Sequence, residues 1–447
     1  MMRSGAASSI PRVGTGAFWL LAAAVGIGLL VLTRLLFDNE YFFFAAYVVL
    51  QYIVLATAWN ILGGYTGYIN FGTGAFFAIG AYSTVVLHNL HAKPAFMQDW
   101  FGMALPAVPL PLMILVGGIV AGLIGLGTGY LTLRLRGVFF AIATLALAVV
   151  VQTLIVNWDY VGGSRGTYVI RPARGPFGVS YIQYLYALMI ALSVIAVAIA
   201  RTIEQSRLGL GFAAIRDDEQ AAEAGGVPTL RLKLIATTLS GGLMGMAGAP
   251  LPYYVTYIEP SSAFNLSYAV NSVAMPVIGG MTSWIGPIIG AVLLGSIQQL
   301  ATVTISSAVN LLIVGLLLII FVIFAPNGIV DLLRGPASGP FAPPLPRVPF
   351  FIRWAALVGG GVLLIYVIGN FGFTLLAIFI IVTGQLAFSS QRLRDMGQSG
   401  WWAMLTLVPV VNLVLLFILL FAPSRSPYRG GMLGAPPTPA REGAAHG

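Results

Sequence analysis

Residues 41–62 read YFFFAAYVVLQYIVLATAWNIL and contain no charged side chain. An α-helix needs about 20 apolar residues to cross a hydrocarbon layer roughly 30 Å thick, so this stretch predicts a transmembrane helix. Comparable runs recur along the chain, which predicts an all-α, polytopic transmembrane helical bundle. The expected segments lie near 18–37, 41–62, 69–87, 110–131, 138–157, 181–200, 235–254, 268–281, 287–305 and 308–325, with further apolar runs at 354–369, 371–388 and 403–422.

The composition excludes a soluble globular enzyme. Of the 447 residues, 58% are hydrophobic and only 8% are charged, and the mean hydropathy is +0.93. A soluble domain is about 25% charged, because its surface must face water. The chain has no cysteine, which excludes disulfides, thiolate metal sites and cysteine nucleophiles. The net charge of +9 indicates basic cytoplasmic loops rather than a nucleic-acid partner.

The basic residues and the prolines predict the topology and the domains. Cytoplasmic loops of membrane proteins are rich in Lys and Arg, which predicts a cytoplasmic N-terminus. The loop 158–180 is an exception, because it falls outside and yet carries three arginines. The predicted domains are a core of about ten membrane segments at 1–334, a Pro-rich linker at 335–350, a hydrophobic module of about three segments at 351–430 and a disordered tail at 431–447.

The charged residues restrict how a transporter of this sequence could be powered. A self-powered ATPase needs a phosphate loop in which Lys is followed by Ser or Thr. Lys93 precedes a proline and Lys233 precedes a leucine, so neither lysine completes that motif. Every Asp and Glu lies in an expected loop or at a helix end, which argues against proton coupling and leaves backbone-coordinated sodium open.

His88 and His91 form an H-x-x-H pair at an expected outer helix end. Two histidines with only Asp99 nearby are more typical of a solvated interfacial pair than of a metal site. We therefore expect this chain to hold no metal ion.

The longest informative polar stretch is 201–233, RTIEQSRLGLGFAAIRDDEQAAEAGGVPTLRLK. Asp217, Asp218 and Glu219 favour the start of a short helix, because negative charge complements the N-terminal helix dipole. The Gly225–Gly226 pair and the following proline then end it. The pattern predicts a small cytoplasmic helix on a long loop, which can transmit force when a partner grips it. An ordinary interfacial amphipathic loop is the alternative.

The pattern Glu219-x-Ala221-Ala222-x-x-x-Gly226 resembles the EAA motif of ABC-importer permeases, and the string IRDDEQAAEAGGV resembles its form in branched-chain amino acid importers. Such importers contain a pair of permease subunits, and this chain resembles the LivM-type subunit of the pair. The resemblance covers roughly residues 40–332. Further matching strings are NILGGYTGYINFGTGAFFAIGAY at 60–82, RLRGVFFAIATLALA at 134–148, VGGSRG at 161–166, GGMTSWIGPIIGA at 279–291 and FAPNGIV at 324–330.

This resemblance implies a coupling helix that docks into a separate ATP-binding subunit. It also implies two ATP-binding subunits, a second homologous permease subunit and a periplasmic solute-binding protein, in a bacterial inner membrane. The chain itself would be no enzyme and would bind no cofactor, because its partners use the ATP. The residues implied in docking are Arg216, Asp217, Asp218, Glu219, Ala221, Ala222 and Gly226.

Two Gly-interrupted segments, 63–80 and 277–290, are candidates for the solute pathway. Paired broken segments favour a midplane route, because freed backbone groups are tolerated only where they face protein or water. Helix packing through small residues is the alternative. Members of this family often have Ser-Leu-Gly-His where this chain has Asn-Phe-Gly-Thr at 70–73, and glycine where it has Thr282. These differences leave the identity of the substrate open. The pathway candidates are Gly64, Thr66, Gly67, Asn70, Gly72, Thr73, Gly279, Gly280, Thr282 and Ser283.

Two further sites complete the interpretation. Arg165, Arg171 and Arg174 are candidates for docking the solute-binding protein, with a solvated loop as the alternative. Residues 392–402, RLRDMGQSGWW, resemble the end of a small bacterial inner-membrane domain of unknown function with an R-L-x-D-x-G-x-S-G-W-W signature. Its tryptophans are suited to the membrane interface, where membrane lipids would be its partners.

The sequence thus predicts the permease subunit of an ATP-driven importer for amino acids, with branched-chain ones favoured. An ion-coupled carrier or facilitator acting alone is one alternative, and a non-transporting membrane sensor or scaffold is another. Urea and short amides are alternative substrates, because an uncharged polar path suits them equally.

Overall fold

The computed structural model describes residues 15–36, 39–92, 108–132, 137–172 and 174–304, together with short pieces between 315 and 419. The chain separates into two compact units, Ile10–Gln299 in one, and Met1–Ser9 with Leu300–Gly447 in the other. The first unit holds almost all of the described residues. Three predicted parts lie outside the described residues, apart from residue 315: the segment 308–325, the linker 335–350 and the tail 431–447. The predicted domain limits therefore stay a prediction.

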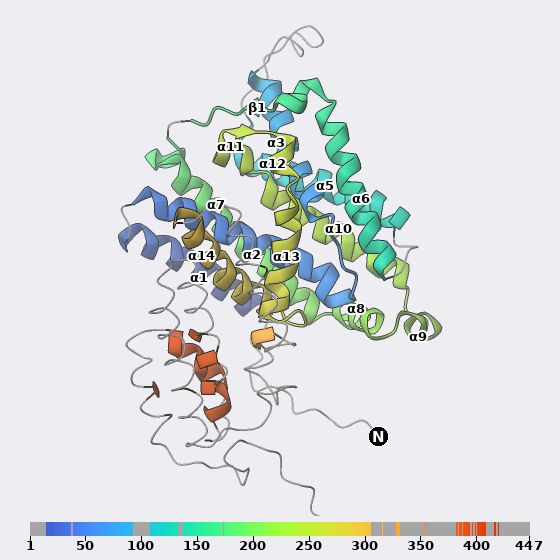
Figure 1. The fold of residues 1–447 in the computed structure, drawn as a ribbon, viewed down its shortest axis with the longest axis vertical. Coiled ribbons are helices and arrows are strands. Elements are labelled where there is room, and N and C mark those ends of the chain that lie inside the picture. Colours follow the sequence, from blue (N-terminus) through green and yellow to red (C-terminus); the bar gives the residue numbers. More distant parts are fainter. Residues whose placement is uncertain are drawn as a thin grey trace, which may run out of the picture. The chain divides into compact units, whose positions relative to one another are not determined.

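The first unit is a bundle of helices, as the hydropathy pattern predicted (Figure 1). Among the described residues, five helical stretches are long and apolar enough to cross a membrane: Glu40–Thr66, Leu110–Leu131, Val138–Val156, Tyr181–Glu204 and Thr229–Val255. The long helices are α1 (Thr15–Leu36), α2 (Glu40–Thr66), α3 (Thr73–Ala92), α5 (Leu110–Thr132), α6 (Val138–Val156), α7 (Tyr181–Glu204), α10 (Thr229–Gly248), α13 (Leu266–Gly279) and α14 (Gly286–Thr304).

Helix α10 lies at the centre of the bundle and packs against α2, α3 and α5. Small residues make these contacts close. A Cβ atom at Gly80 of α3 would overlap the Gly245 carbonyl of α10, and one at Gly248 of α10 would overlap the Phe77 carbonyl of α3. Close approach of backbones through glycine is the usual way in which helices associate in membranes, because hydrophobicity alone does not drive them together in lipid.

Two pairs of helices are separated by short interruptions at the glycines that the sequence singled out. Helix α2 ends at Thr66, and Gly67 follows with a left-handed φ of 78° and donates its N–H to the Gly63 carbonyl. We call residues 67–72, before α3, the first break. Helix α13 ends at Gly279, and residues 280–285, before α14, form the second break.

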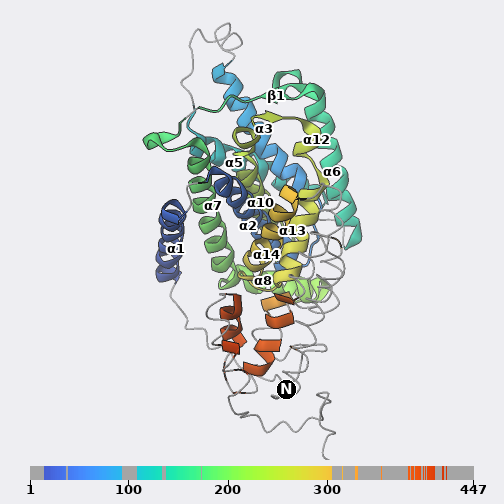
Figure 2. The same cartoon turned by 60° about the vertical axis from the view of Figure 1, so that its left-hand side comes forward.

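The two ends of the bundle carry different structures (Figures 1 and 2). At one end lie the short helices α8 (Arg207–Asp217) and α9 (Glu219–Ala224). The other end holds the strands β1 (Thr167–Tyr168) and β2 (Tyr257–Ile258), which pair antiparallel with Thr167 opposite Ile258. Short helices accompany them: η1 (Asp159–Val161), η2 (Gly163–Arg165), η3 (Pro176–Gly178), α11 (Leu251–Val255) and α12 (Pro260–Ala263).

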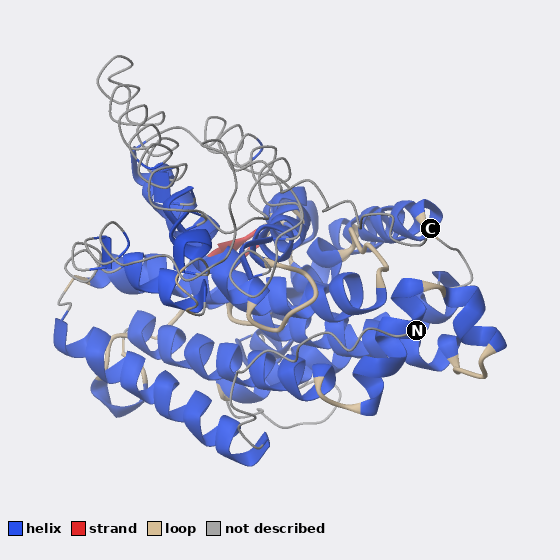
Figure 3. Ribbon diagram, turned by 90° about the horizontal axis from the view of Figure 1, so that it is seen from below, coloured by secondary structure: helices blue, strands red, loops and turns tan. Residues whose placement is uncertain are grey.

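In the described part of the chain these two strands are the only sheet, so the fold is all-α as predicted (Figure 3). In the second unit, residues Gly400–Leu407 form the 3₁₀ helix η4. The side chain of Arg392 is fully buried there and donates from Nε to the Leu419 carbonyl at 2.9 Å, while Trp402 is exposed. Arg392 therefore bonds within its own unit.

Candidate functional site

The short polar helix predicted between two membrane helices is present as α9, preceded by α8. Asp218 separates them in an extended conformation, with φ −159° and ψ 108°. Its Oδ1 accepts hydrogen bonds from the backbone N–H groups of Gln220 (2.9 Å) and Ala221 (3.0 Å), which is the arrangement of a helix N-cap. Gly226, with φ 84°, follows the C-cap residue of α9, and Val227 donates its N–H to the Ala222 carbonyl. We call residues 205–228 the α8–α9 segment.

One detail of the prediction needs correction. Asp217 was expected with Asp218 and Glu219 at the start of the short helix, but it is the last residue of α8. Because the Asp218 carboxylate caps the backbone itself, a second acidic residue before the cap is not required. Arg216 also belongs to α8, and its Nε lies 3.4 Å from Oδ1 of Asp217.

Glu219 turns toward the membrane bundle instead of away from it. Its Oε1 accepts a hydrogen bond from Lys233 Nζ of α10 at 2.7 Å, and the Lys233 and Glu219 side chains are only 4% and 14% exposed. Tyr68 of the first break donates its hydroxyl proton to Oε2 of Glu219. Lys233 Nζ also donates to the Tyr68 hydroxyl at 3.2 Å and lies 4.8 Å from the Tyr68 ring centroid. We call Tyr68, Glu219 and Lys233 the first joint.

A second contact joins the same two regions. Arg216 Nη1 lies 3.5 Å from the Gly64 carbonyl near the end of α2, and the Arg216 side chain passes over Gly67. A Cβ at Gly67 would lie 3.3 Å from Arg216 Cγ, so a larger residue there would press on the arginine. The α8–α9 segment therefore rests directly on the first break.

The second break meets the last turns of α2, just before the first break, inside the bundle. Asn60 Nδ2 of α2 donates to the Ser283 carbonyl of the second break at 3.3 Å. A Cβ at Gly64 would overlap the Met281 carbonyl, so only glycine allows this approach. Near the start of α3, Ser272 of α13 lies within hydrogen-bond distance of Thr73, with 3.1 Å between the hydroxyls. The two segments that the sequence paired as pathway candidates are thus neighbours.

Most of the polar pathway candidates are buried within this chain. Asn70 accepts a hydrogen bond from the Gly72 N–H at 2.7 Å, while its carbonyl accepts from Trp59 Nε1 at 2.8 Å. Thr66 donates to the Leu62 carbonyl of its own helix at 2.6 Å. Ser283 accepts from the Ile285 N–H at 3.2 Å. These side chains shape the breaks, whereas Gly67 and Thr282 are exposed.

The remaining glycines of the candidate set also shape the breaks. Gly72 carries the N–H that closes the turn on Asn70. A Cβ at Gly279 would overlap the Gly286 carbonyl, and Gly280 has a left-handed φ of 120°. The pathway assignment stays a prediction.

The second break is connected to the end of α7, which leads into α8. Glu204 Oε2 accepts a hydrogen bond from the Trp284 backbone N–H at 2.7 Å and lies 3.4 Å from the Tyr65 hydroxyl of α2. One turn earlier, the Arg201 guanidinium lies 3.7 Å from the Phe18 ring centroid and 5.5 Å from that of Trp284. We call Arg201, Glu204 and Trp284 the second joint.

The three arginines proposed to dock a binding protein all lie at the end opposite α9. Arg165 and Arg174 are exposed, and the Arg165 carbonyl accepts a hydrogen bond from the Tyr257 hydroxyl at 2.6 Å. Arg171 is half-buried and lies 5.8 Å from the Phe44 ring centroid. It lines a small polar pocket with Glu40, Ser180 and Tyr181.

Of the histidine pair, His88 Nδ1 lies 3.0 Å from the Tyr253 hydroxyl, so this ring is engaged inside the bundle. The His91 side chain lies outside the described residues. No group of three possible metal-ligating side chains occurs among the residues that the structure describes.

Several residues of the site were missed by sequence reasoning. Lys233 was expected in the loop before the segment 235–254, as one of the basic residues of the cytoplasmic side, and that position gave no indication of a buried partner. Tyr68 and Glu204 gave no such indication either, because their partners lie far away in the chain. Asn60 is an amide inside an apolar run, and that pattern could have identified it as an interhelical contact.

The comparisons with known proteins agree with this architecture. The family described as "Branched-chain amino acid transport system / permease component" matches residues 41–322, which is more than half of the chain. This chain belongs to that permease family. The match confirms the resemblance that the EAA-like pattern and its accompanying strings indicated. A second family, described as a protein of unknown function (DUF805), matches residues 348–428 of the permease and confirms the likeness of its C-terminal module.

Individual relatives of the permease include several transport proteins. It is 28% identical to the high-affinity branched-chain amino acid transport system permease protein LivM of Escherichia coli K12, over 63% of this chain and 68% of that protein. It is 24% identical to the probable branched-chain amino acid transport permease protein LivH of Methanocaldococcus jannaschii, over 58% and 82% respectively. It is 26% identical to the L-arabinose ABC transporter permease protein AraH of Azospirillum brasilense, over 47% and 62%. No solved structure is significantly similar to it.

The family sets the general role of the permease. Members are multi-pass membrane proteins that serve as transport subunits and are not themselves catalytic. The α8–α9 segment, the two breaks and the two joints are therefore parts of a transport subunit.

Proposed function

We propose that this permease is one membrane-spanning half of an ATP-driven importer that carries amino acids, with branched-chain amino acids favoured, across the bacterial inner membrane. Its N-terminus and the α8–α9 segment face the cytoplasm. It works with a second homologous permease subunit, two ATP-binding subunits and a periplasmic solute-binding protein. It binds no cofactor itself, because the partner subunits hydrolyse the ATP.

The exposed face of α9 carries this proposal. Only Ala222 of that helix is buried, while Gln220, Ala221, Glu223 and Ala224 are exposed at the end of the bundle. Small side chains on such a helix let a partner surface come close to its backbone. The docking surface on the ATP-binding subunit is therefore proposed to receive this face, together with Gly226. Glu219 takes part from the inner side, as the residue that holds the helix to the bundle.

The proposed solute route runs beside the two breaks. Thr282 and Gly67 are exposed there, and the Arg216 side chain lies over Gly67. The side chains of the second break itself carry no charge, and an uncharged polar lining passes a zwitterion without trapping it, whereas a fixed charge would hold one of its ends. The buried side chains Thr66, Asn70, Thr73 and Ser283 support the route by holding the breaks in shape.

At the opposite end, we assign Arg165 and Arg174 to the docking of the solute-binding protein, because their side chains are exposed. Arg171 contributes less directly, since it packs over Phe44. Rim charges of this kind mainly speed association and make it salt-dependent. Reversing Arg165 and Arg174 to Glu should therefore weaken binding of the delivery protein at low salt, measured by surface plasmon resonance.

The decisive experiment is reconstitution of the permease in liposomes with a homologous second permease subunit, two ATP-binding subunits and a solute-binding protein. Uptake of radiolabelled leucine that requires ATP on the α9 side is expected. Uptake without ATP would favour an ion-coupled carrier, and an assembled complex that moves neither leucine, urea nor a short amide would favour a sensor or scaffold.

A matched pair of variants tests the docking face. Ala221→Trp places a large side chain on the exposed face of α9, and Tyr168→Trp places one on an exposed position of β1 at the other end. The ATP-binding subunit should no longer copurify with Ala221→Trp and should copurify normally with Tyr168→Trp. Normal copurification with both would contradict the assigned face.

A further inference from the structure

Helix α8 packs on the bundle through the buried side chains of Phe212 and Ile215, whereas α9 is attached to it mainly through polar contacts. Helix α9 buries only Ala222, so it has almost no apolar surface with which to pack on the bundle. Its connection to α10 depends on two carboxylates: Glu219 with Lys233 at 2.7 Å, and Glu223 with the Thr229 hydroxyl at 2.7 Å. Only the first of these also reaches the first break, through Tyr68.

Formation of the first joint carries a free-energy cost, because two charged groups are removed from water, and this cost indicates a role besides stability. Transferring a lysine and a glutamate out of water carries a desolvation penalty that their attraction only partly offsets. Here the ammonium has the Glu219 carboxylate, the Tyr68 hydroxyl and the Tyr68 ring as partners, and each carboxylate oxygen has its own donor. A fully satisfied cluster of this kind fixes one geometry between its members.

The second joint holds the other break to the start of the same segment. Glu204 at the end of α7 accepts from the Trp284 N–H, and the chain passes from Glu204 into α8 within two residues. Glu204, directly before the α8–α9 segment, is thus held to the second break, and Glu219 at the start of α9 is held to the first break. Asn60 of α2 also donates to the Ser283 carbonyl, which connects the helix before the first break to the second break.

We propose that Tyr68, Glu219 and Lys233 act as positioning residues that transmit movement of α9 to the first break, while Glu204 and Trp284 transmit movement of the same segment to the second break. This inference rests on the proposed function, in which a partner subunit moves α9. Glu219 is therefore assigned an inward, transmitting role, and the docking contacts are left to the exposed residues of α9. A shift of α9 moves both breaks together, because one break is hydrogen-bonded to Glu219 of α9 and the other to Glu204, which leads directly into α8.

The first test measures the connection itself, without any partner. The natural chain has no cysteine, so Ile69→Cys in the first break and Gln220→Cys on α9 provide two unique sites for spin labels. Both positions are exposed. Pulsed electron–electron double resonance on the full chain in lipid nanodiscs should give a narrow distance distribution. Tyr68→Phe and Glu219→Gln should shift or broaden it by several ångströms.

Glu223→Gln is the matched control, because it alters the other carboxylate contact of α9 and leaves the first joint intact. It should leave the label distribution narrow. A distribution that is equally narrow in Tyr68→Phe, Glu219→Gln and Glu223→Gln would overturn the proposal. This result does not depend on transport, so it separates failure of the joint from failure of the proposed function.

The second test uses the reconstituted importer and measures how many molecules of solute are imported for each ATP hydrolysed. Tyr68→Phe should lower this ratio about tenfold while ATP hydrolysis and copurification of the ATP-binding subunit continue, since mutations along a coupling route change it by that order. The exchange Glu219→Lys with Lys233→Glu should restore part of the ratio lost in Glu219→Lys alone. An unchanged ratio in Tyr68→Phe, or a charge exchange no better than the single change, would overturn the transmitting role.

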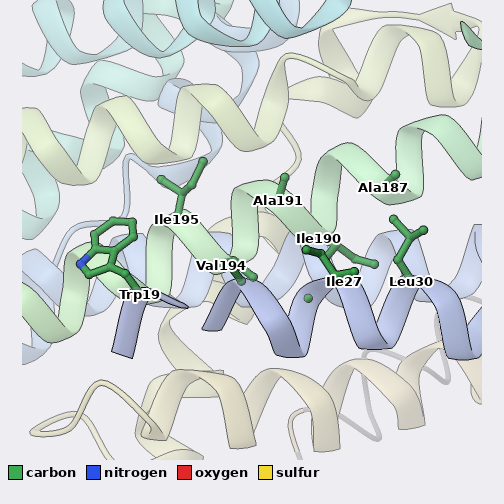
Figure 4. A pocket seen from close by; sticks show the side chains of 10 residues that line it. Trp19, Ile27, Leu30, Ala187, Ile190, Ala191, Val194 and Ile195 are labelled. Atoms are coloured by element: carbon green, nitrogen blue, oxygen red, sulfur yellow. The ribbon is translucent and has the colours of Figure 1, made fainter. Parts of the chain in front are cut away.

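An apolar groove between α1 and α7, lined by Trp19, Gly26, Ile27, Ala191 and Val194, carries no second proposal (Figure 4), because within a membrane it gives no sign of a particular occupant.

Discussion

Lys233 is a charged residue that the fold accepts only because Glu219 accompanies it. Removal of one partner from a buried ion pair leaves an uncompensated charge and costs about 3 kcal/mol, whereas replacement of both partners by neutral groups costs far less. Glu219→Gln alone should therefore destabilise the permease more than the double change Glu219→Gln with Lys233→Met. Chemical unfolding in mild detergent, followed by tryptophan fluorescence, measures this difference. Equal stability of the two variants would mean that the pair is effectively exposed.

Asp218 has a separate task, which is to start α9. Loss of an N-cap carboxylate costs about 1 kcal/mol, because two backbone N–H groups lose their acceptor. Asp218→Ala should thus speed amide hydrogen exchange in residues 220–224, while Asp218→Asn keeps most of the protection. Asp217→Ala is the control, since this exposed neighbour ends α8 and caps nothing. Faster exchange in both alanine variants would argue against the cap.

Among the helices, α3 and α10 depend on glycine for their contact. Gly80→Ala would drive a methyl group into the Gly245 carbonyl, and the backbone of α10 would have to move to accommodate it. Overpacking of this kind costs about 1–3 kcal/mol. Gly127→Ala on α5 is the matched control, because nothing lies within 4 Å of a Cβ atom there. The first variant should lower the melting temperature in detergent, and the second should leave it unchanged or raise it.

In the membrane, the two ends of the bundle should be accessible to a water-soluble reagent from opposite sides. Glu223→Cys on α9 should react with a membrane-impermeant maleimide only in inverted vesicles, whereas Ser164→Cys near β1 should react in intact spheroplasts. Both residues are exposed and the chain has no native cysteine, so each label reports one site. The opposite pattern of labelling would reverse the proposed orientation and place α9 away from any cytoplasmic ATP-binding subunit.

The features predicted from the amino-acid sequence are those that depend on neighbouring residues. Hydropathy over about 20 residues predicts a membrane helix, and the run at 41–62 is indeed α2. Glycine at 67 and at 279–280 ends a helix because of its own backbone freedom, so both breaks were found. The short helix α9 followed from acidic residues before three alanines and a glycine pair, all within one segment.

The contacts that join these elements were not predictable in the same way, because they depend on how distant segments pack. Tyr68 and Glu219 are 151 positions apart, and Glu204 and Trp284 are 80 apart. A local pattern identifies Glu219 as part of α9 but gives no indication that its carboxylate points inward, since that direction depends on where α10 places Lys233. The inward orientation of Glu219 and the contact of α2 with the second break are therefore properties of the packed bundle, in which side chains far apart in the chain satisfy one another's charges and hydrogen bonds.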